Sequence, residues 1–424
     1  MQVFIRTFRI TIISLLCIIL LQRSVIPSSD PIERIRKFTR QTEFDYATWT
    51  INAAGVKTIQ MLLDHADLPK DTARHDLVIE YTTAIQDLRM VNYALVTLYS
   101  DPGVPDPVAA AMQLIAQRNA VQERIDTIGP VVETILQQQV STILAGLDLT
   151  TIGSPVPPVL FHSSPLPYAL IVSPREIIRQ DANISIETGM TLEDRISLEE
   201  EVAAGLNVSA LVEEVGGIGT YPTMVQETED LSWLIEVIAH EWTHNYLNWH
   251  PLGVNYDTTP ELRTMNETTA SLAGKEIASA VIAQYYPERV PPPAPPANEA
   301  PPEQPEVIDT APVFDFRAEM HTTRVHADEL LADGKIEEAE DYMEQRRLFL
   351  WENGYQIRKL NQAYFAFHGA YADQPGGAAG EDPVGPAVRS LREKSASLAD
   401  FIHVMSRFTS FQQLQQALGL PVKD

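Results

Sequence analysis

The chain has 424 residues, of which 45% are hydrophobic, and this is enough apolar material for two or three domains with cores of their own. Its formal net charge of −26 argues against nucleic acid as a partner, because phosphate binding needs clustered Lys and Arg. Cys17 is the only cysteine, and no Gly-x-Ser-x-Gly motif is present. The sequence therefore excludes intrachain disulfides and gives no indication of hydrolysis by a cysteine or serine nucleophile.

Residues 1–29 are expected to target the chain for export. Arg6 and Arg9 precede the uncharged run Ile10–Leu21, whose length suits a signal peptide better than a complete membrane span. The stretch Val3–Ile26 could also remain as a single signal anchor, with its arginines at the two ends. The basic residues that follow argue the other way, for retention in the cytoplasm. We expect an extracytoplasmic protein that is either secreted or anchored to the membrane by this segment.

Residues 30–152 are predicted to form an N-terminal helical domain. Apolar residues recur at helical spacing in three segments, which proline-containing breaks separate: residues 33–66, 70–99 and 107–146. The simplest interpretation is a helical bundle that packs against a catalytic core. The proline-rich segment Ser154–Pro158 marks the start of that core.

The predicted core, residues 153–289, begins with a first buried strand and contains two long helices. The apolar run Tyr168–Val172 indicates a buried strand. Asp230 is a good helix N-cap, and apolar residues recur every three or four positions after it: Leu231, Leu234, Ile235, Ile238 and Trp242. A second helix is predicted from about Pro260 to Tyr285, because Pro287 follows its end.

The segment His240–His244, with the sequence His-Glu-Trp-Thr-His, lies on the first of these helices. Histidines four residues apart share one helix face and can bind one metal ion, and Glu241 between them can accept a proton from a metal-bound water. A catalytic zinc ion needs three protein ligands and one open position. Glu267, on the second helix, is the candidate third ligand; a solvated carboxylate on the helix surface is the alternative interpretation.

His240–His244 followed by Asn-Glu-Thr-Thr-Ala at 266–270 resembles the gluzincins, the zinc peptidases that include thermolysin and the membrane alanyl aminopeptidases. The predicted secreted bacterial aminopeptidases are a more distant likeness. The resemblance covers about residues 210–275. It implies a zincin-like core with a small sheet, in which His240, His244 and Glu267 bind one Zn²⁺ and Glu241 is the general base.

The resemblance also implies that the glycine-rich run before the zinc helix is an edge strand whose backbone pairs with extended substrate. Gly217 and Gly219 are then the candidate substrate-binding residues, since glycine lets another backbone approach closely. The run Gly216–Thr220 lacks the Glu with which alanyl aminopeptidases hold a substrate amine. Ser271 stands where thermolysin has an Asp that orients a His. Endopeptidase and aminopeptidase activity therefore both stay open.

Two further regions complete the predicted organisation. Residues 290–312 are predicted to be a proline-rich loop or linker, because eight of the fifteen residues from Pro291 to Pro305 are proline. Residues 313–424 are predicted to form a C-terminal helical domain, which includes a helix at about 354–371.

Gluzincins use a Tyr or His from a downstream helix to stabilise the oxyanion of the tetrahedral intermediate. The resemblance implies that Tyr364 has this catalytic role. Asn361 and His368 lie on the same side of the predicted helix and are candidate substrate-binding residues. Packing in a core is the alternative interpretation of the stripe to which Tyr364 belongs: Ile357, Leu360, Tyr364, Phe367 and Tyr371.

The sequence thus predicts a mainly helical α+β protein, with a zincin-like core between helical N- and C-terminal domains. The predicted function is zinc-dependent hydrolysis of peptide or protein substrates by an exported enzyme. An exported helical module that binds a partner, with a structural or relic metal site and no turnover, is the alternative function.

Overall fold

The computed structural model describes residues 31–62, 71–101, 103–150, 153–290 and 314–421. The predicted targeting segment and almost all of the proline-rich linker lie outside these residues. Helices dominate the described chain, so the prediction of a mainly helical protein is confirmed. The strands form two three-stranded sheets, where a single small sheet was expected. None of the described helices is both long and apolar enough to span a bilayer.

Within the described residues, four helices precede the first strand: α2 (Pro31–Thr39), α3 (Tyr46–Leu62), α4 (Asp71–Ser100) and α5 (Pro107–Gly146). The first predicted helix, 33–66, is divided because residues 42–44 pair with a strand: Phe44 N donates to Ser185 O at 2.9 Å, and Glu187 N donates to Thr42 O at 2.8 Å. Asp106 caps α5 by accepting from Ala109 N.

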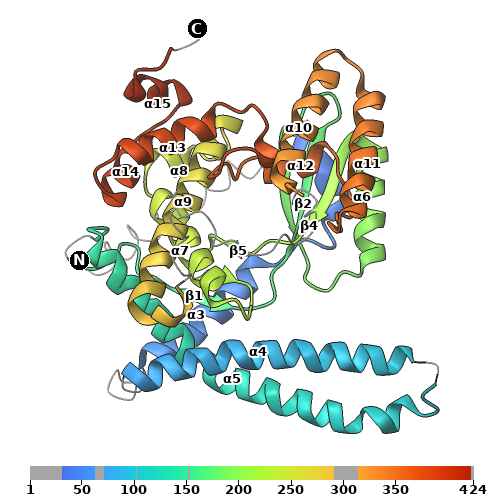
Figure 1. The fold of residues 1–424 in the computed structure, drawn as a ribbon, viewed down its shortest axis with the longest axis vertical. Helices are drawn as coiled ribbons and strands as arrows, with labels where there is room; N and C mark the ends of the chain where they lie inside the picture. The colour runs from blue at the N-terminus through green and yellow to red at the C-terminus, as the bar shows by residue number, and fades with distance from the viewer. Residues whose placement is uncertain (1–30, 63–70, 102, 151–152, 291–313, 422–424) are drawn as a thin grey trace, which may run out of the picture.

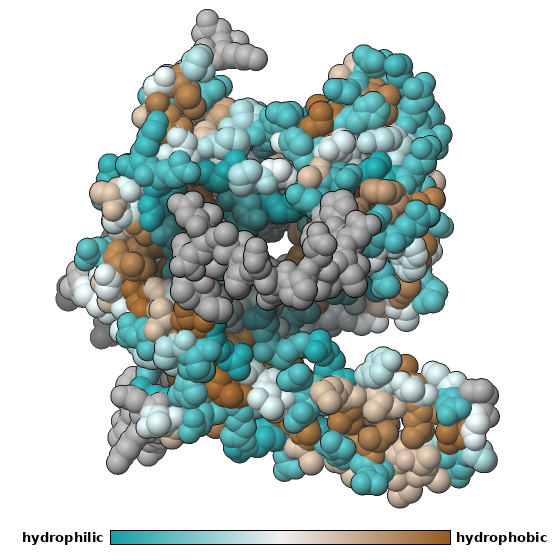
Figure 2. Space-filling view, in the orientation of Figure 1, coloured by the Kyte–Doolittle hydropathy of each residue, from teal (hydrophilic) through white to brown (hydrophobic). Residues whose placement is uncertain are grey.

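Helices α4 and α5 pack side by side as a long hairpin that projects from the body of the molecule (Figure 1). Apolar side chains are exposed along it (Figure 2), among them Met90, Tyr93, Val96 and Met112. The base of the hairpin joins the main hydrophobic core through α5, where Ile135, Leu136 and other apolar residues are buried.

The first sheet has the order β3-β2-β4, with both pairs antiparallel: β2 (Tyr168–Pro174), β3 (Ala182–Ile186) and β4 (Val208–Glu213). Successive side chains of β2 point to opposite faces, and both faces are covered. Leu170 and Val172 pack toward α6 (Leu192–Leu206) and α2, whereas Ala169 and Ile171 pack toward α12 (Gln362–His368). This double burial explains why the strand is apolar without interruption.

The second sheet has the order β1-β6-β5: β1 (Phe161–Ser163), β6 (Thr223–Val225) and β5 (Gly217–Ile218). β5 pairs antiparallel with β6 and lies at the edge of this sheet. An edge strand has one row of unpaired backbone groups that can accept another extended chain.

The two long core helices are α7 (Leu231–Leu247) and α9 (Pro260–Tyr285), with the short α8 (Pro251–Val254) between them and a 3₁₀ turn, η2 (Pro287–Arg289), after them. The Asp230 side chain caps α7, as predicted, and Thr259 caps α9. Gly274 lets the helices approach closely, because a Cβ there would lie 2.9 Å from Glu236 O and 3.2 Å from His240 Cβ.

The C-terminal helices are α10 (Phe316–Ala332), α11 (Ile336–Glu352), α12, α13 (Val384–Lys394), α14 (Leu398–Met405) and α15 (Phe411–Leu418), with a 3₁₀ turn, η3 (Gly377–Ala379), before α13. They were predicted as one domain, but they pack in two places (Figure 1). α10, α11 and α12 share a core of their own beside the first sheet, whereas α13, α14 and α15 bury their apolar faces in the main core with α9.

Candidate metal centre

The structure brings the three predicted metal ligands together between α7 and α9. His240 Nε2 lies 3.0 Å from His244 Nε2, and Glu267 Oε2 lies 3.5 Å from the first and 3.4 Å from the second. Glu267 Oε2 is buried and has no hydrogen-bond partner among the residues that the structure describes. A buried carboxylate oxygen without a partner is costly, and two imidazoles with one carboxylate are the donor set of a catalytic zinc site. The residues present therefore fit a zinc ion.

A hydrogen bond fixes the orientation of His244. Its Nδ1 lies 2.8 Å from Asn266 Oδ1, and Asn266 Nδ2 donates to Leu252 O at 3.4 Å. Because the amide oxygen can only accept, His244 Nδ1 carries a hydrogen, and Nε2, which faces the other two ligands, is the nitrogen left to bind an ion. Asn266 directly precedes Glu267 in the motif, but the sequence interpretation gave it no role. Ser271, which stands where thermolysin has an Asp that orients a His, lines the cavity.

Glu267 is held by a tyrosine from outside the two helices. The Tyr256 hydroxyl, in the connection between α8 and α9, donates to Glu267 Oε1. The Tyr256 ring also packs edge-on against His244, with ring centroids 6.2 Å apart. One oxygen of the Glu267 carboxylate is thus bonded, which leaves the other free to face the histidines.

The predicted base, Glu241, is buried beside the edge strand. A Cβ at Gly217 would lie 2.7 Å from Glu241 Oε1, and a Cβ at Gly219 would lie 3.4 Å from Glu241 Oε2. The two glycines therefore let β5 approach the carboxylate. Burial raises the pKa of Glu241, and the charge of Glu267 adds to this rise, while the two histidines oppose it. A raised pKa suits a group that takes up and returns a proton near neutral pH.

A cavity of about 500 Å³ joins these groups. Its lining includes the three ligands, Glu241, and three of the four predicted substrate contacts: Gly217, Gly219 and His368. Asn361 and Tyr364 do not line it.

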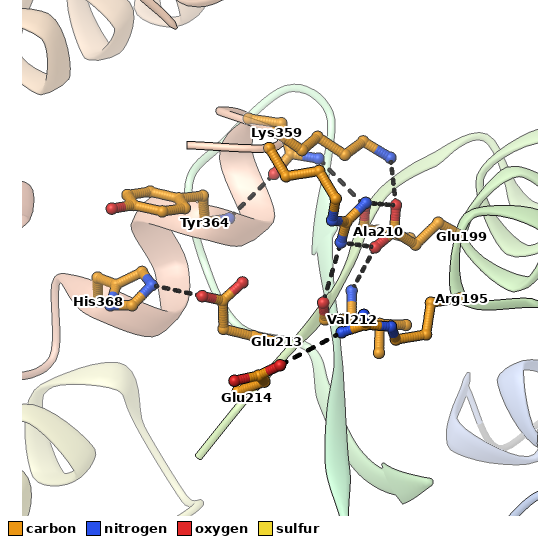
Figure 3. A network of polar contacts seen from close by, with 11 residues as sticks. Arg195, Glu199, Ala210, Val212, Glu213, Glu214, Lys359, Tyr364 and His368 are labelled. Carbon is orange, nitrogen blue, oxygen red and sulfur yellow. Dashed lines mark hydrogen bonds and ion pairs between the residues drawn. The ribbon is translucent and has the colours of Figure 1, made fainter. Parts of the chain in front are cut away.

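Asn361 and Tyr364 lie away from the cavity because α12 begins at Gln362, whereas the predicted helix began near 354. Asn361 is the N-cap of α12: its Oδ1 accepts from Tyr364 N at 3.0 Å, and its Nδ2 donates to Ala210 O at 3.1 Å. The Tyr364 ring packs among the apolar residues between α12 and the first sheet, 4.3 Å from the His368 ring. Figure 3 shows His368 directed toward Glu213, with Nε2 3.6 Å from the Glu213 carboxylate.

The segment that precedes α12 is not helical, and β4 and α6 hold it. Lys359 contacts the buried Glu199 carboxylate at 3.3 Å (Figure 3). Arg358 contacts the same carboxylate at 2.6 Å and also donates to Val212 O. These charge-assisted bonds satisfy a carboxylate that is 1% exposed. The helical pattern of the sequence beyond 354 is overridden by these contacts.

Tyr371 is a second tyrosine beside the metal ligands, although the sequence interpretation placed it in a packing stripe. Its ring stacks on His240 with centroids 6.2 Å apart and an interplanar angle of 29°, and it lines the cavity. Side chains of α9 hold the segment that carries it: Arg263 donates to Ala366 O at 2.9 Å, Thr268 donates to Ala370 O at 3.3 Å, and Lys275 pairs with Asp373.

The metal-free centre holds a proton, which predicts how zinc affinity depends on pH. Burial lowers the pKa of His244, but the charge of the nearby Glu267 carboxylate outweighs burial and raises the pKa to about 9. Burial alone would raise the pKa of Glu267, yet the imidazoles hold it well below its usual range. Below pH 9, zinc must therefore displace the His244 proton, and its affinity should rise about tenfold per pH unit up to that value.

Competition with a chelator between pH 6 and 9, corrected for protonation of the chelator, measures this slope. Calorimetry in buffers of different ionisation enthalpy gives the number of protons released. An affinity that does not change between pH 6.5 and 8.5 would show that His244 is already neutral in the metal-free protein.

Comparison with protein-family models, with curated proteins and with solved structures finds no match for this chain. The resemblance to the gluzincins therefore remains a prediction, supported by the motif residues and by the geometry that they adopt.

Proposed function

We propose that this protein is a zinc-dependent peptidase of the gluzincin type, with a zincin-like core formed by α7, α9 and the β1-β6-β5 sheet. The observation that carries the proposal is that Glu267 Oε2, unpartnered among the described residues, faces two histidines, with the buried Glu241 carboxylate in the same cavity. Two nitrogen ligands and one carboxylate favour zinc over calcium or magnesium, which prefer oxygen ligands alone.

A zinc ion held there supplies Lewis acidity toward water and toward the substrate carbonyl. Glu241 accepts a proton from the attacking water at its carboxylate, which the backbone of Gly217 and Gly219 closely covers. It then returns the proton to the leaving amine. The unpaired edge of β5 binds the substrate backbone in an extended conformation beside this carboxylate.

Tyr371, and not Tyr364, is assigned to the developing oxyanion. Its ring stacks on His240 inside the cavity, so its hydroxyl can donate a hydrogen bond near the metal centre. His368 lines the same cavity and contributes to substrate binding. From the sequence of residues 1–29 alone, we further propose that the protein acts outside the cytoplasm, secreted or anchored to the membrane.

Digestion of a mixed peptide library by the full-length protein, read by mass spectrometry, tests the proposal. Cleavage should require zinc: it should stop when a chelator removes the metal and return when zinc is added back. Products that lose residues from one end would indicate an exopeptidase, and internal cuts an endopeptidase. A zinc-loaded protein that cleaves no peptide would refute the proposal and favour a module that binds without turnover.

A further inference from the structure

One carboxylate in the cavity has no role in the mechanism above. Glu236 lies on α7 one helical turn before His240 and lines the cavity. Among the described residues, no hydrogen bond or ion pair engages its side chain, and burial raises its pKa. The cation whose charge acts on it, Lys275, is itself paired with Asp373. A partly buried carboxylate without a partner has lost part of its hydration without compensation. A cation that binds it therefore stabilises it strongly.

The other carboxylates of the cavity are accounted for. Glu267 faces the histidines, and Glu241 lies against the glycines of β5. Glu214 is exposed and lies 3.7 Å from Arg195, with which it pairs. Arg263, a cation in the cavity lining, is buried and donates to Ala366 O. Glu236 is thus available to a charge brought by the substrate.

The position of Glu236 relative to β5 indicates where along a bound peptide a cationic group would lie. A Cβ at Gly216 would touch Trp233, one at Gly217 would touch Val237 and Glu241, and one at Gly219 would lie near Glu241 and His244. β5 therefore runs alongside α7 in the same direction, from the turn that contains Glu236 to the metal ligands.

A peptide paired with the free edge of β5 would follow the same path. One helical turn advances about 5–6 Å, and two extended residues span about 6–7 Å. A side chain within two residues of the cleaved bond therefore reaches Glu236.

We infer that Glu236 determines specificity by binding a cationic group of the peptide within two residues of the cleaved bond. The group is an ammonium or a guanidinium, from a Lys or Arg side chain or from a free N-terminus. This inference rests on the proposed function, since it describes the substrate of the same cavity. A hydrogen-bonded ion pair at a partly buried site is worth about 10–100-fold in kcat/KM.

The test uses peptides built on a cleavage site mapped in the library digest. Each position within two residues of the cut carries Lys, norleucine or Glu, and each peptide is made with a free and with an acetylated N-terminus. The wild type should cleave the cationic peptide about 10–100-fold faster than its neutral match. Glu236→Gln should remove that preference, and Glu236→Lys should reverse it toward the Glu peptide.

Glu214→Gln is the matched control, because Glu214 also lines the cavity but is paired with Arg195, and it should keep the Lys to norleucine ratio. The zinc content of each variant checks that the site is intact. A preference confined to free N-termini would identify the α-amine as the cation.

Equal cleavage of cationic and neutral peptides, or a preference that survives Glu236→Gln, would overturn the inference while leaving the proposed peptidase standing. Failure to cleave any peptide would refute both.

Discussion

Glu241→Gln is expected to lower kcat by about 10²–10⁴-fold, the usual contribution of a general base, while the protein keeps its zinc. Gln matches Glu in size, so the close contacts of Glu241 with Gly217 and Gly219 persist, and it belongs to none of the ligand pairs of the metal centre. The amide cannot take up a proton near neutral pH. The proposed chemistry therefore loses its base and nothing else.

Zinc content by mass spectrometry and kcat on a mapped peptide are the two measurements required. A variant that binds the full amount of zinc but has no turnover would place Glu241 in the chemical step. Turnover near that of the wild type would remove Glu241 from this role, and a parallel loss of zinc would indicate that the variant had distorted the centre.

His244→Ala is expected to lose zinc binding. The variant leaves one imidazole and one carboxylate to bind the ion. Asn266 loses the histidine that it orients, although Tyr256 still holds Glu267. Loss of a group that merely orients a ligand costs roughly 10–100-fold in metal affinity, so loss of the ligand itself should cost more. The affinity is measured by competition with a chromophoric zinc chelator at fixed pH.

His250→Ala is the matched control for this variant. His250 follows α7 and lies 2.9 Å from Tyr246 O through its Nδ1, and it is not part of the cavity lining. Its replacement should leave zinc affinity unchanged. Wild-type affinity in His244→Ala would mean that the ion, if bound at all, is bound elsewhere.

The metal ligands could be predicted because the information that places them is local. A helix of 3.6 residues per turn brings His240 and His244 to one face, and a capping residue starts each helix where the sequence indicates. Asp230 and Thr259 both serve as caps in the structure. The chain then has only to reverse its direction between the two helices for Glu267 to reach the histidines.

The surroundings of the ligands could not be predicted in this way. Tyr256 lies in an irregular connection, where side chains follow no period, and its contact with Glu267 depends on the path of that connection. Tyr364 was predicted to be the catalytic tyrosine, on a helix expected to run from about 354 to 371, and Tyr371 was named only in the packing stripe. Contacts of Arg358 with Glu199, far away in the sequence, shorten that helix and so change which aromatic ring reaches the cavity. Periodicity carries no information about such distant partners.

The order of the site along the chain has a consequence for biosynthesis. All three ligands and Glu241 belong to α7 and α9, whereas His368 and Tyr371 follow residues 291–313 and dock onto α9 through Arg263, Thr268 and Lys275. Because translation proceeds from the N-terminus, the ribosome adds the metal ligands before the segment that closes the cavity beside them. Under the proposed function, a nascent chain therefore carries the residues that bind the metal before it carries those that contact the substrate.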